Sequence, residues 1–260
     1  MQWLISVAMG LWAVWTWSKT QEQERQSRRD RLAALYVNPF MSACEDLQSR
    51  IYSILERGGL RTLRQRYPDG AYAEETLYLI VRYFGWATAL TRLSPYSQDP
   101  VALRLTQAVR DAFATTGEGF AVGAFNFFHP EQKALGKIVM SRKPGQHGVE
   151  LDTISSYKFR ERLALPALSN SSSVQQSLQA LRDAESAEDL RGRNRLEMAQ
   201  CHLVDLLNYL EAREGHRLFE GERKKCSSSQ ERSARNRVRR LPTTNGLARP
   251  LRRARSSRRG

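Results

Sequence analysis

The chain has 260 residues, with 41 Lys and Arg against 27 Asp and Glu, which gives a net charge of +14 at pH 7. Fourteen of the basic residues and only one acidic residue lie in residues 223–260, so residues 1–222 are close to neutral, which excludes a uniformly basic body. The three cysteines, Cys44, Cys201 and Cys226, are odd in number, widely spaced and without a CxxC pair, which argues against a secreted disulfide framework and against a zinc site.

Residues 1–17, MQWLISVAMGLWAVWTW, contain no charged side chain, and we predict a transmembrane helix over residues 1–20. The run is short for a hydrocarbon core of about 30 Å, but tryptophans lie toward both ends, as in the aromatic belts of membrane spans. The residues expected to form this anchor are Trp3, Leu4, Ile5, Leu11, Trp12, Val14, Trp15 and Trp17.

Two other interpretations of this segment remain open. A secretory signal peptide would carry a basic start and a small-x-small cleavage site, and the segment has neither. A helix lying in the plane of the membrane would carry a strongly charged face. The basic residues Lys19, Arg25, Arg28, Arg29 and Arg31 follow the run, so the positive-inside rule predicts an external N-terminus and a cytoplasmic remainder.

The first elements after the anchor are a charged helical stalk, residues 21–37, and a helix that we expect to begin at Asn38 and Pro39, an N-cap followed by a first helical residue. Gly58 and Gly59 are expected to end this helix. Its apolar positions step by three and four, as on one face of a helix: Phe40, Cys44, Leu47, Ile51, Ile54 and Leu55.

A second strong helix is predicted over residues 72–93. Gly85 interrupts it, and because Gly in a helix interior costs about 1 kcal/mol, we interpret Gly85 as a close-packing point against another helix. Close approach of a ligand to the backbone is the alternative. The inner face of this helix is predicted to hold Leu77, Ile80, Val81, Phe84 and Ala87.

Asp99 and Pro100 have the pattern of a cap and predict a third helix that runs to about residue 114. Residues 120–128, FAVGAFNFF, have a strand-like composition but no partner strand, so we expect a buried irregular segment or the start of a helix. A fourth helix is predicted from 129 to 140 and a short one from about 151 to 165, with residues 141–148, SRKPGQHG, as a loop.

Two further helices are predicted after a linker at residues 166–173. Ser173 is expected to cap a helix over residues 174–187, and the last helix covers residues 190–214. Its apolar stripe consists of Leu196, Ala199, Leu203, Leu206, Leu207 and Leu210.

These elements predict an all-α fold of about six or seven helices without an internal repeat. Four parts follow along the chain: a transmembrane anchor (1–20), a charged stalk (21–37), an all-α domain (38–222) and a disordered Arg- and Ser-rich tail (223–260).

No catalytic or cofactor-binding signature is present, so we expect a protein that is not an enzyme and holds no cofactor or metal. His202 and Asp205 form an i,i+3 pair, but a metal or acid–base site needs a second converging group that the sequence does not supply. A pocket around Trp86 is where we would expect an activity of unrecognised class. The other histidines are expected to be structural or solvated: His129, His147 and His216.

The basic residues Arg57, Arg61, Arg64 and Arg66 form the one cluster of this kind expected inside the domain. A solvated turn is the simplest interpretation. The sharper interpretation is contact with an anionic lipid headgroup or an acidic partner.

The tail has no aromatic residue on which bases could stack and too little apolar surface to fold alone. An anchor would place anionic lipid nearest to it, so we expect contact with the anionic leaflet. Non-specific binding of nucleic-acid phosphates and an inert tail are the alternatives. The residues expected to contact anions are Arg237, Arg239, Arg240, Arg252, Arg253, Arg255, Arg258 and Arg259.

Three runs, NPFMSACEDLQSRIYSIL, ETLYLIVRYFGW and FNFFHPEQKALGKIVMSR, resemble an uncharacterised group of bacterial proteins with one N-terminal span and a helical cytoplasmic domain. The resemblance covers residues 1–214 and implies an architecture, without an activity or functional residues. We therefore expect a membrane-anchored, non-enzymatic module that binds an unknown protein partner or organises the leaflet. The alternatives are a membrane-tethered nucleic-acid-binding protein acting through the tail and an enzyme of unrecognised class.

Overall fold

The computed structural model describes residues 2–116, 123–145, 148–215 and 217–226. Most of these residues are helical, which confirms the all-α class in its main feature, although two short strands are also present. The expected anion contacts of the tail and the histidines at 147 and 216 lie outside the described residues.

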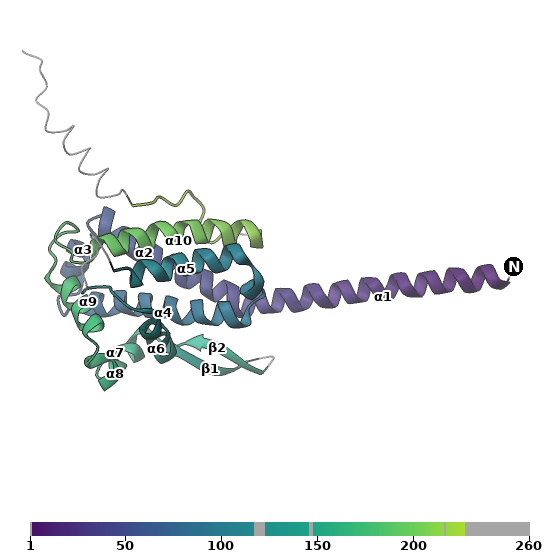
Figure 1. The fold of residues 1–260 in the computed structure, drawn as a ribbon, viewed down its shortest axis with the longest axis horizontal. Coiled ribbons are helices and arrows are strands. Elements are labelled where there is room, and N and C mark those ends of the chain that lie inside the picture. The colour runs from purple at the N-terminus through teal and green to yellow at the C-terminus, as the bar shows by residue number, and fades with distance from the viewer. Residues whose placement is uncertain (1, 117–122, 146–147, 216, 227–260) are drawn as a thin grey trace, which may run out of the picture. The chain divides into compact units, whose positions relative to one another are not determined.

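A continuous helical rod forms the N-terminal part of the described chain. Helix α1 (Gln2–Leu32) passes through a π-helical turn, η1 (Ala33–Val37), directly into α2 (Asn38–Glu56). Asn38 has helical backbone angles, and its N–H bonds the Ala33 carbonyl five residues back, so the prediction that Asn38 caps a new helix is wrong. Pro39 supplies no N–H, and the wider π turn lets the helix pass it without a break. Figure 1 shows α1 projecting from the body in purple.

Among the described residues, no helix combines the length and the apolar character needed to cross a membrane. The transmembrane helix expected over residues 1–20 is therefore not supported by the structure. The described tryptophans of this segment, Trp12, Trp15 and Trp17, are exposed by 68%, 59% and 66%.

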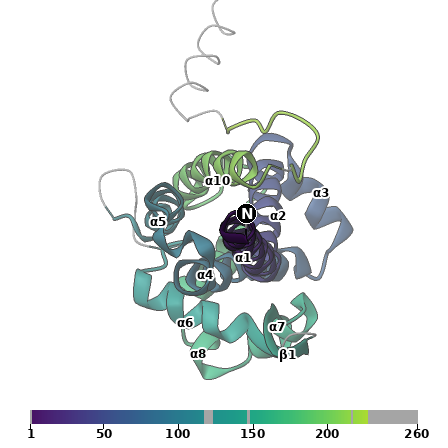
Figure 2. The same ribbon diagram turned by 90° about the vertical axis from the view of Figure 1, so that its right-hand side faces the viewer.

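Four long helices form the centre of the body: α2, α4 (Ala71–Leu93), α5 (Pro100–Ala114) and α10 (Arg193–Glu214). Helix α10 packs against both α5 and α2, and α4 packs against α2, as the end-on view in Figure 2 shows. Phe84 of α4 meets the ring of Phe113 at 5.4 Å between centroids, an edge-to-face contact that joins α4 to α5. All inner-face residues expected on α2, α4 and α10 are buried.

Gly85 is a close-packing point, as predicted. A Cβ atom at Gly85 would lie 3.1 Å from the Gly136 carbonyl oxygen, and one at Gly136 would lie 2.8 Å from the Gly85 nitrogen. These glycines let α4 and α6 (His129–Val139) approach with their backbones in contact. Because neither residue has a side chain, α6 can pack closely against α4.

Residues 140–153 differ from the prediction of a loop followed by a helix. Strands β1 (Met140–Gly145) and β2 (Gly148–Thr153) pair antiparallel, with Met140 opposite Thr153. The alternation of apolar and acidic residues in VELDT has the period of a strand, and this signal was missed. The helix expected over 151–165 is confined to α7 (Ser156–Arg162).

The remaining elements are short or shifted from their predicted bounds. Asp99 caps α5 as expected, because its carboxylate accepts hydrogen bonds from the backbone of the first turn. The cap of α9 (Ser172–Asp183) is Ser171 rather than the predicted Ser173. In the aromatic run, residues 124–127 are buried and irregular, as one of the two predictions stated, whereas 120–122 lie outside the described residues. The other elements are α3 (Gly59–Arg66), η2 (Pro95–Gln98) and α8 (Pro166–Ser169).

The chain after α10 turns back along this helix, and we call residues 217–226 the strap. The Leu218 N–H bonds the Glu211 carboxylate at 2.8 Å, and nearer the start of α10 the Gln200 amide bonds the backbone of Lys224 and Cys226 at 2.9 and 2.8 Å. Residues 223–226 were expected in the tail, but they pack on the body, which continues four residues past the predicted boundary at 222.

Candidate functional site

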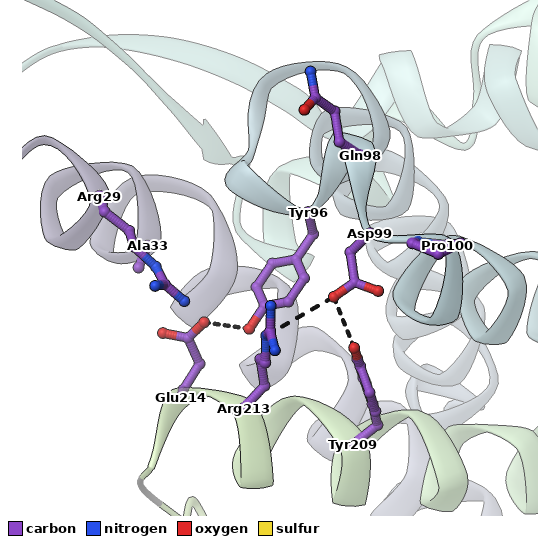
Figure 3. Close-up of a pocket in the computed structure, with 9 residues that line it drawn as sticks. All are labelled: Arg29, Ala33, Tyr96, Gln98, Asp99, Pro100, Tyr209, Arg213 and Glu214. Atoms are coloured by element: carbon purple, nitrogen blue, oxygen red, sulfur yellow. Dashed lines mark hydrogen bonds and ion pairs between the residues drawn. The ribbon is translucent and has the colours of Figure 1, made fainter. Parts of the chain in front are cut away.

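A cleft of about 430 Å³ lies where the rod joins the body, and we call it the stalk-base cleft. Figure 3 shows its side chains converging from three elements: the α1–η1 junction, the η2 turn with the start of α5, and the end of α10. Its residues are Arg29, Ala33, Tyr96, Gln98, Asp99, Pro100, Tyr209, Arg213 and Glu214.

Two phenol–carboxylate pairs organise the stalk-base cleft. The Tyr96 hydroxyl donates a hydrogen bond to Glu214, and the Tyr209 hydroxyl donates one of 2.7 Å to Asp99. Asp99 also accepts the backbone N–H groups that begin α5, and the Arg213 guanidinium lies 4.0 Å from its carboxylate. The pairs therefore join the end of α10 to the turn that precedes α5.

The surroundings fix the protonation of these groups. Burial, the hydrogen bond to Glu214 and the charge of that carboxylate together raise the pKa of Tyr96. Partial burial favours a higher pKa for Asp99, but the hydrogen bond from Tyr209, the backbone N–H groups of α5 and the charge of Arg213 outweigh it and lower that pKa. A protonated phenol and an ionised carboxylate suit a clamp between elements, and neither tyrosine is set up as a base.

A second group of charges is buried under the strap. The Arg223 guanidinium donates two hydrogen bonds to Glu211, at 2.7 and 2.6 Å, and one to Glu45, at 2.6 Å. The Arg223 side chain is 3% exposed. This triad joins the strap to both α2 and α10, and Glu211 lies on α10 between Tyr209 and Arg213 of the stalk-base cleft.

Beside this triad, a groove of about 390 Å³ separates α2 from the strap, and we call it the α2–strap groove. Arg57 and Lys224 are exposed cations on its lining, and the Arg57 guanidinium lies 5.3 Å from the centre of the Tyr52 ring. The buried side chain of Gln48 and the half-exposed ring of Phe219 complete its polar and apolar surfaces.

The four arginines expected to act together are divided by the structure. Arg57 lines the α2–strap groove, whereas Arg64 donates a hydrogen bond of 2.9 Å to the Ala184 carbonyl, which is a structural contact. Arg66 lies 5.7 Å from the Tyr67 ring, and Arg61 is exposed on α3. The four arginines thus have different contacts, and Arg57 is the one of them that lines the α2–strap groove.

The pair His202 and Asp205 does not develop into a metal or acid–base site. Burial lowers the pKa of His202, and the Asp205 carboxylate is bound by Lys225 of the strap at 2.6 Å. Within the described ranges, no three His, Cys, Asp or Glu side chains are placed to hold a metal ion. Trp86, where a pocket was expected, is 1% exposed in the packed core.

Most residues that make the two cavities carried no recognised signal in the sequence, apart from Arg57 and Asp99. Arg223 was counted with the tail because it begins a basic run, and Gln48 lies in the mostly polar stretch EDLQSR of α2 without a signal of its own. Tyr96 and Tyr209 are distant in sequence from their partners. Asp99 had a local signal, which was assigned to capping alone.

Comparisons with known proteins supply no family for this chain. Its sequence matches no model of a protein family, no curated protein and no solved structure.

Proposed function

We propose that this protein is a membrane-attached, non-enzymatic helical module whose N-terminal rod holds it at a lipid surface and whose body binds a protein partner. The observation that carries the proposal is the exposure of Trp12, Trp15 and Trp17 on α1, at 59% to 68%. Large exposed aromatic groups are uncommon on soluble surfaces and favour the interface between lipid and water.

The charge pattern along the rod supports this assignment and suggests an orientation. Residues 1–17 are uncharged, and the exposed second half of α1 carries Lys19 and four arginines. Basic residues directly after an apolar segment favour the cytoplasmic side of a membrane, where they meet anionic headgroups. We propose that the apolar part of α1 enters the membrane as a single pass and that the body lies in the cytoplasm.

The body contributes sites suited to binding rather than to catalysis. The stalk-base cleft lies where the rod meets the body and holds two hydrogen-bonded phenols, and the α2–strap groove presents cations and aromatic rings to solvent. We further propose that the basic residues after 226 contact anionic lipid.

Flotation with vesicles that contain anionic lipid tests the attachment. The full chain should float, and the variant Trp12→Ser/Trp15→Ser/Trp17→Ser should stay with the soluble fraction, because it loses three large exposed apolar groups on α1. Tyr157→Ser is the matched control, since Tyr157 is an aromatic residue with a similar exposure of 67% on α7. Release of the wild-type chain by salt at about 1 M, or flotation of the triple variant, would contradict the proposal.

A further inference from the structure

Gln48 is a buried polar residue that the fold does not use. It is 5% exposed and lines the α2–strap groove, and among the described residues its side-chain amide makes no hydrogen bond. The amide nitrogen and oxygen of Gln48 are not fully enclosed, so water in the groove reaches them. An amide that faces a groove without a protein partner is therefore available to a ligand.

Gln200 shows what a glutamine does on the other side of the same strap. Its nitrogen donates to the Lys224 carbonyl at 2.9 Å, and its oxygen accepts the Cys226 N–H at 2.8 Å. A glutamine amide can thus pair with a peptide backbone through one donor and one acceptor. Gln48 offers the same donor and acceptor. A peptide backbone matches both groups, whereas a fully ionised phosphate has only acceptors.

The charges of the groove select an acidic ligand. Arg57 and Lys224 are exposed, while the third cation, Arg223, is already bound by Glu45 and Glu211. Stacking on Tyr52 holds the Arg57 guanidinium in place, so less conformational freedom is lost when it pairs with a carboxylate. The exposed Glu222 is the one remaining acid on the lining, which therefore carries three cations and two carboxylates.

The rod separates this groove from the membrane proposed for the tryptophans. Residues 17 and 57 are 40 positions apart along α1, η1 and α2, and a rise of 1.5 Å per residue puts them roughly 60 Å apart. The lipid surface that holds Trp17 is then out of reach for the Arg57 side chain. The ligand of the groove must come from the aqueous side.

We propose that the α2–strap groove binds an acidic peptide segment of a soluble protein partner, with Gln48 paired to the peptide backbone and Arg57 and Lys224 paired to carboxylates. The proposal rests on the function proposed above, since it names the surface by which the module takes its partner. A groove of about 390 Å³ accommodates a few side chains of such a segment.

A selection from a displayed library of random peptides, with the full chain in detergent micelles as the target, tests this proposal. The recovered peptides should be rich in Asp and Glu. Their fluorescein-labelled forms should bind the wild-type chain, and fluorescence anisotropy should show a Kd raised about tenfold or more in Arg57→Glu, Lys224→Glu and Gln48→Leu. Circular dichroism melting confirms that each variant is folded.

Arg66→Glu is the matched control, because it removes a similar cation–ring contact outside the groove, and its Kd should equal that of the wild type. Failure to enrich acidic peptides, or equal weakening by Arg57→Glu and Arg66→Glu, would overturn the proposal. Arg57-dependent binding of anionic vesicles to the chain that lacks Trp12, Trp15 and Trp17 would instead make the groove a lipid contact, which also overturns it. Peptide binding is measured without a membrane, so loss of flotation and loss of peptide binding report on the two proposals separately.

Discussion

At the scale of single residues, Arg223 pairs with two carboxylates, the buried Glu211 and the partly buried Glu45. Its three hydrogen bonds, of 2.6 to 2.7 Å, satisfy Glu211 and Glu45 together. The attraction within such a group is largely offset by the loss of hydration, so the triad adds little net stability. Removal of the arginine alone is destabilising, because Glu211 and Glu45 then lose their counter-ion in a poorly hydrated site.

The substitution Arg223→Met should lower the free energy of unfolding at neutral pH by about 3–5 kcal/mol, as is usual when one partner of a buried ion pair is removed. Urea unfolding followed by circular dichroism measures this loss. Lys224→Met, on an exposed neighbour in the same segment, should change the free energy by no more than about 0.5 kcal/mol.

The loss of stability in Arg223→Met should also depend on pH. The hydrogen bonds from Arg223 hold the pKa of Glu211 below its usual value, with the Leu218 N–H and the charges of Arg223 and Arg217 adding to this and burial opposing it. A lowered folded-state pKa stabilises the wild type above the unfolded value of about 4.3, and this stability is lost as pH falls through the folded value. The difference between wild type and Arg223→Met should therefore shrink in acid, and a constant difference from pH 7 to acid would exclude this linkage.

The sequence predicted buried apolar residues far better than these polar ones. Every residue expected on the inner stripe of α10 is buried, because a period of 3.6 marks the inner face locally. The contact of Arg223 with Glu45 joins residues 178 positions apart, and no local pattern carries that information. Gln48 was missed for the same reason, since the groove that it lines also depends on distant residues of the strap, two of which, Arg223 and Lys224, were assigned to the tail.

At the scale of elements, the two glycines at the α4–α6 contact set how closely these helices approach. Neither position has room for a methyl group against the backbone of the other helix. The prediction that Gly85 is a packing point came from the cost of glycine within a helix. Its partner, Gly136, could not be predicted, because the sequence of one helix does not specify which other helix packs against it.

The substitution Gly136→Ala should therefore destabilise the protein by about 1–3 kcal/mol, the usual cost of forcing extra volume into a packed contact. Elsewhere in a helix the same change is stabilising, since alanine restricts the unfolded chain. Thermal unfolding measures the effect, and Lys133→Ala on the exposed side of α6 provides the comparison. A Gly136→Ala variant that is as stable as the wild type would show that α4 and α6 can separate freely.

The elements predicted wrongly share a physical cause. Asn38 has the residue type of a cap, but a π turn carries the helix past Pro39, so the local preference is overridden. The hairpin of β1 and β2 was missed because each strand has only the other as a partner, and it is held to the body by contacts such as the Tyr78 hydroxyl bonding the Ile154 carbonyl at 2.6 Å. Both depend on tertiary structure.

At the scale of the whole described chain, the rod borders one of the two cavities and the strap borders the other. The stalk-base cleft lies where the rod meets the body, and the α2–strap groove lies toward the other end of α2. The sequence indicated the mostly helical fold correctly, whereas it placed the boundary of the body at residue 222. Charge counting moved Arg223 into the tail, although its neighbours in space are acidic.

Two truncated chains test this boundary. A chain that ends after residue 222 lacks Arg223 and the bonds of Gln200 to the strap, so it should lose at least as much stability as Arg223→Met, about 3–5 kcal/mol. A chain that ends after residue 228 keeps these contacts and should unfold at the same urea concentration as the full chain. Equal stability of the two truncated chains would show that the body is complete at residue 222.

The position of Arg223 in the sequence also determines when its ion pair with Glu45 can form during synthesis. Glu45 is synthesised 178 residues earlier, and at about 5–20 residues per second the ribosome takes roughly 10–35 s to supply the arginine that neutralises it. During that interval the rod is already outside the ribosome with its tryptophans exposed, while the bundle still contains a carboxylate without its counter-ion. A growing chain of this protein can therefore meet a lipid surface before its body is able to close.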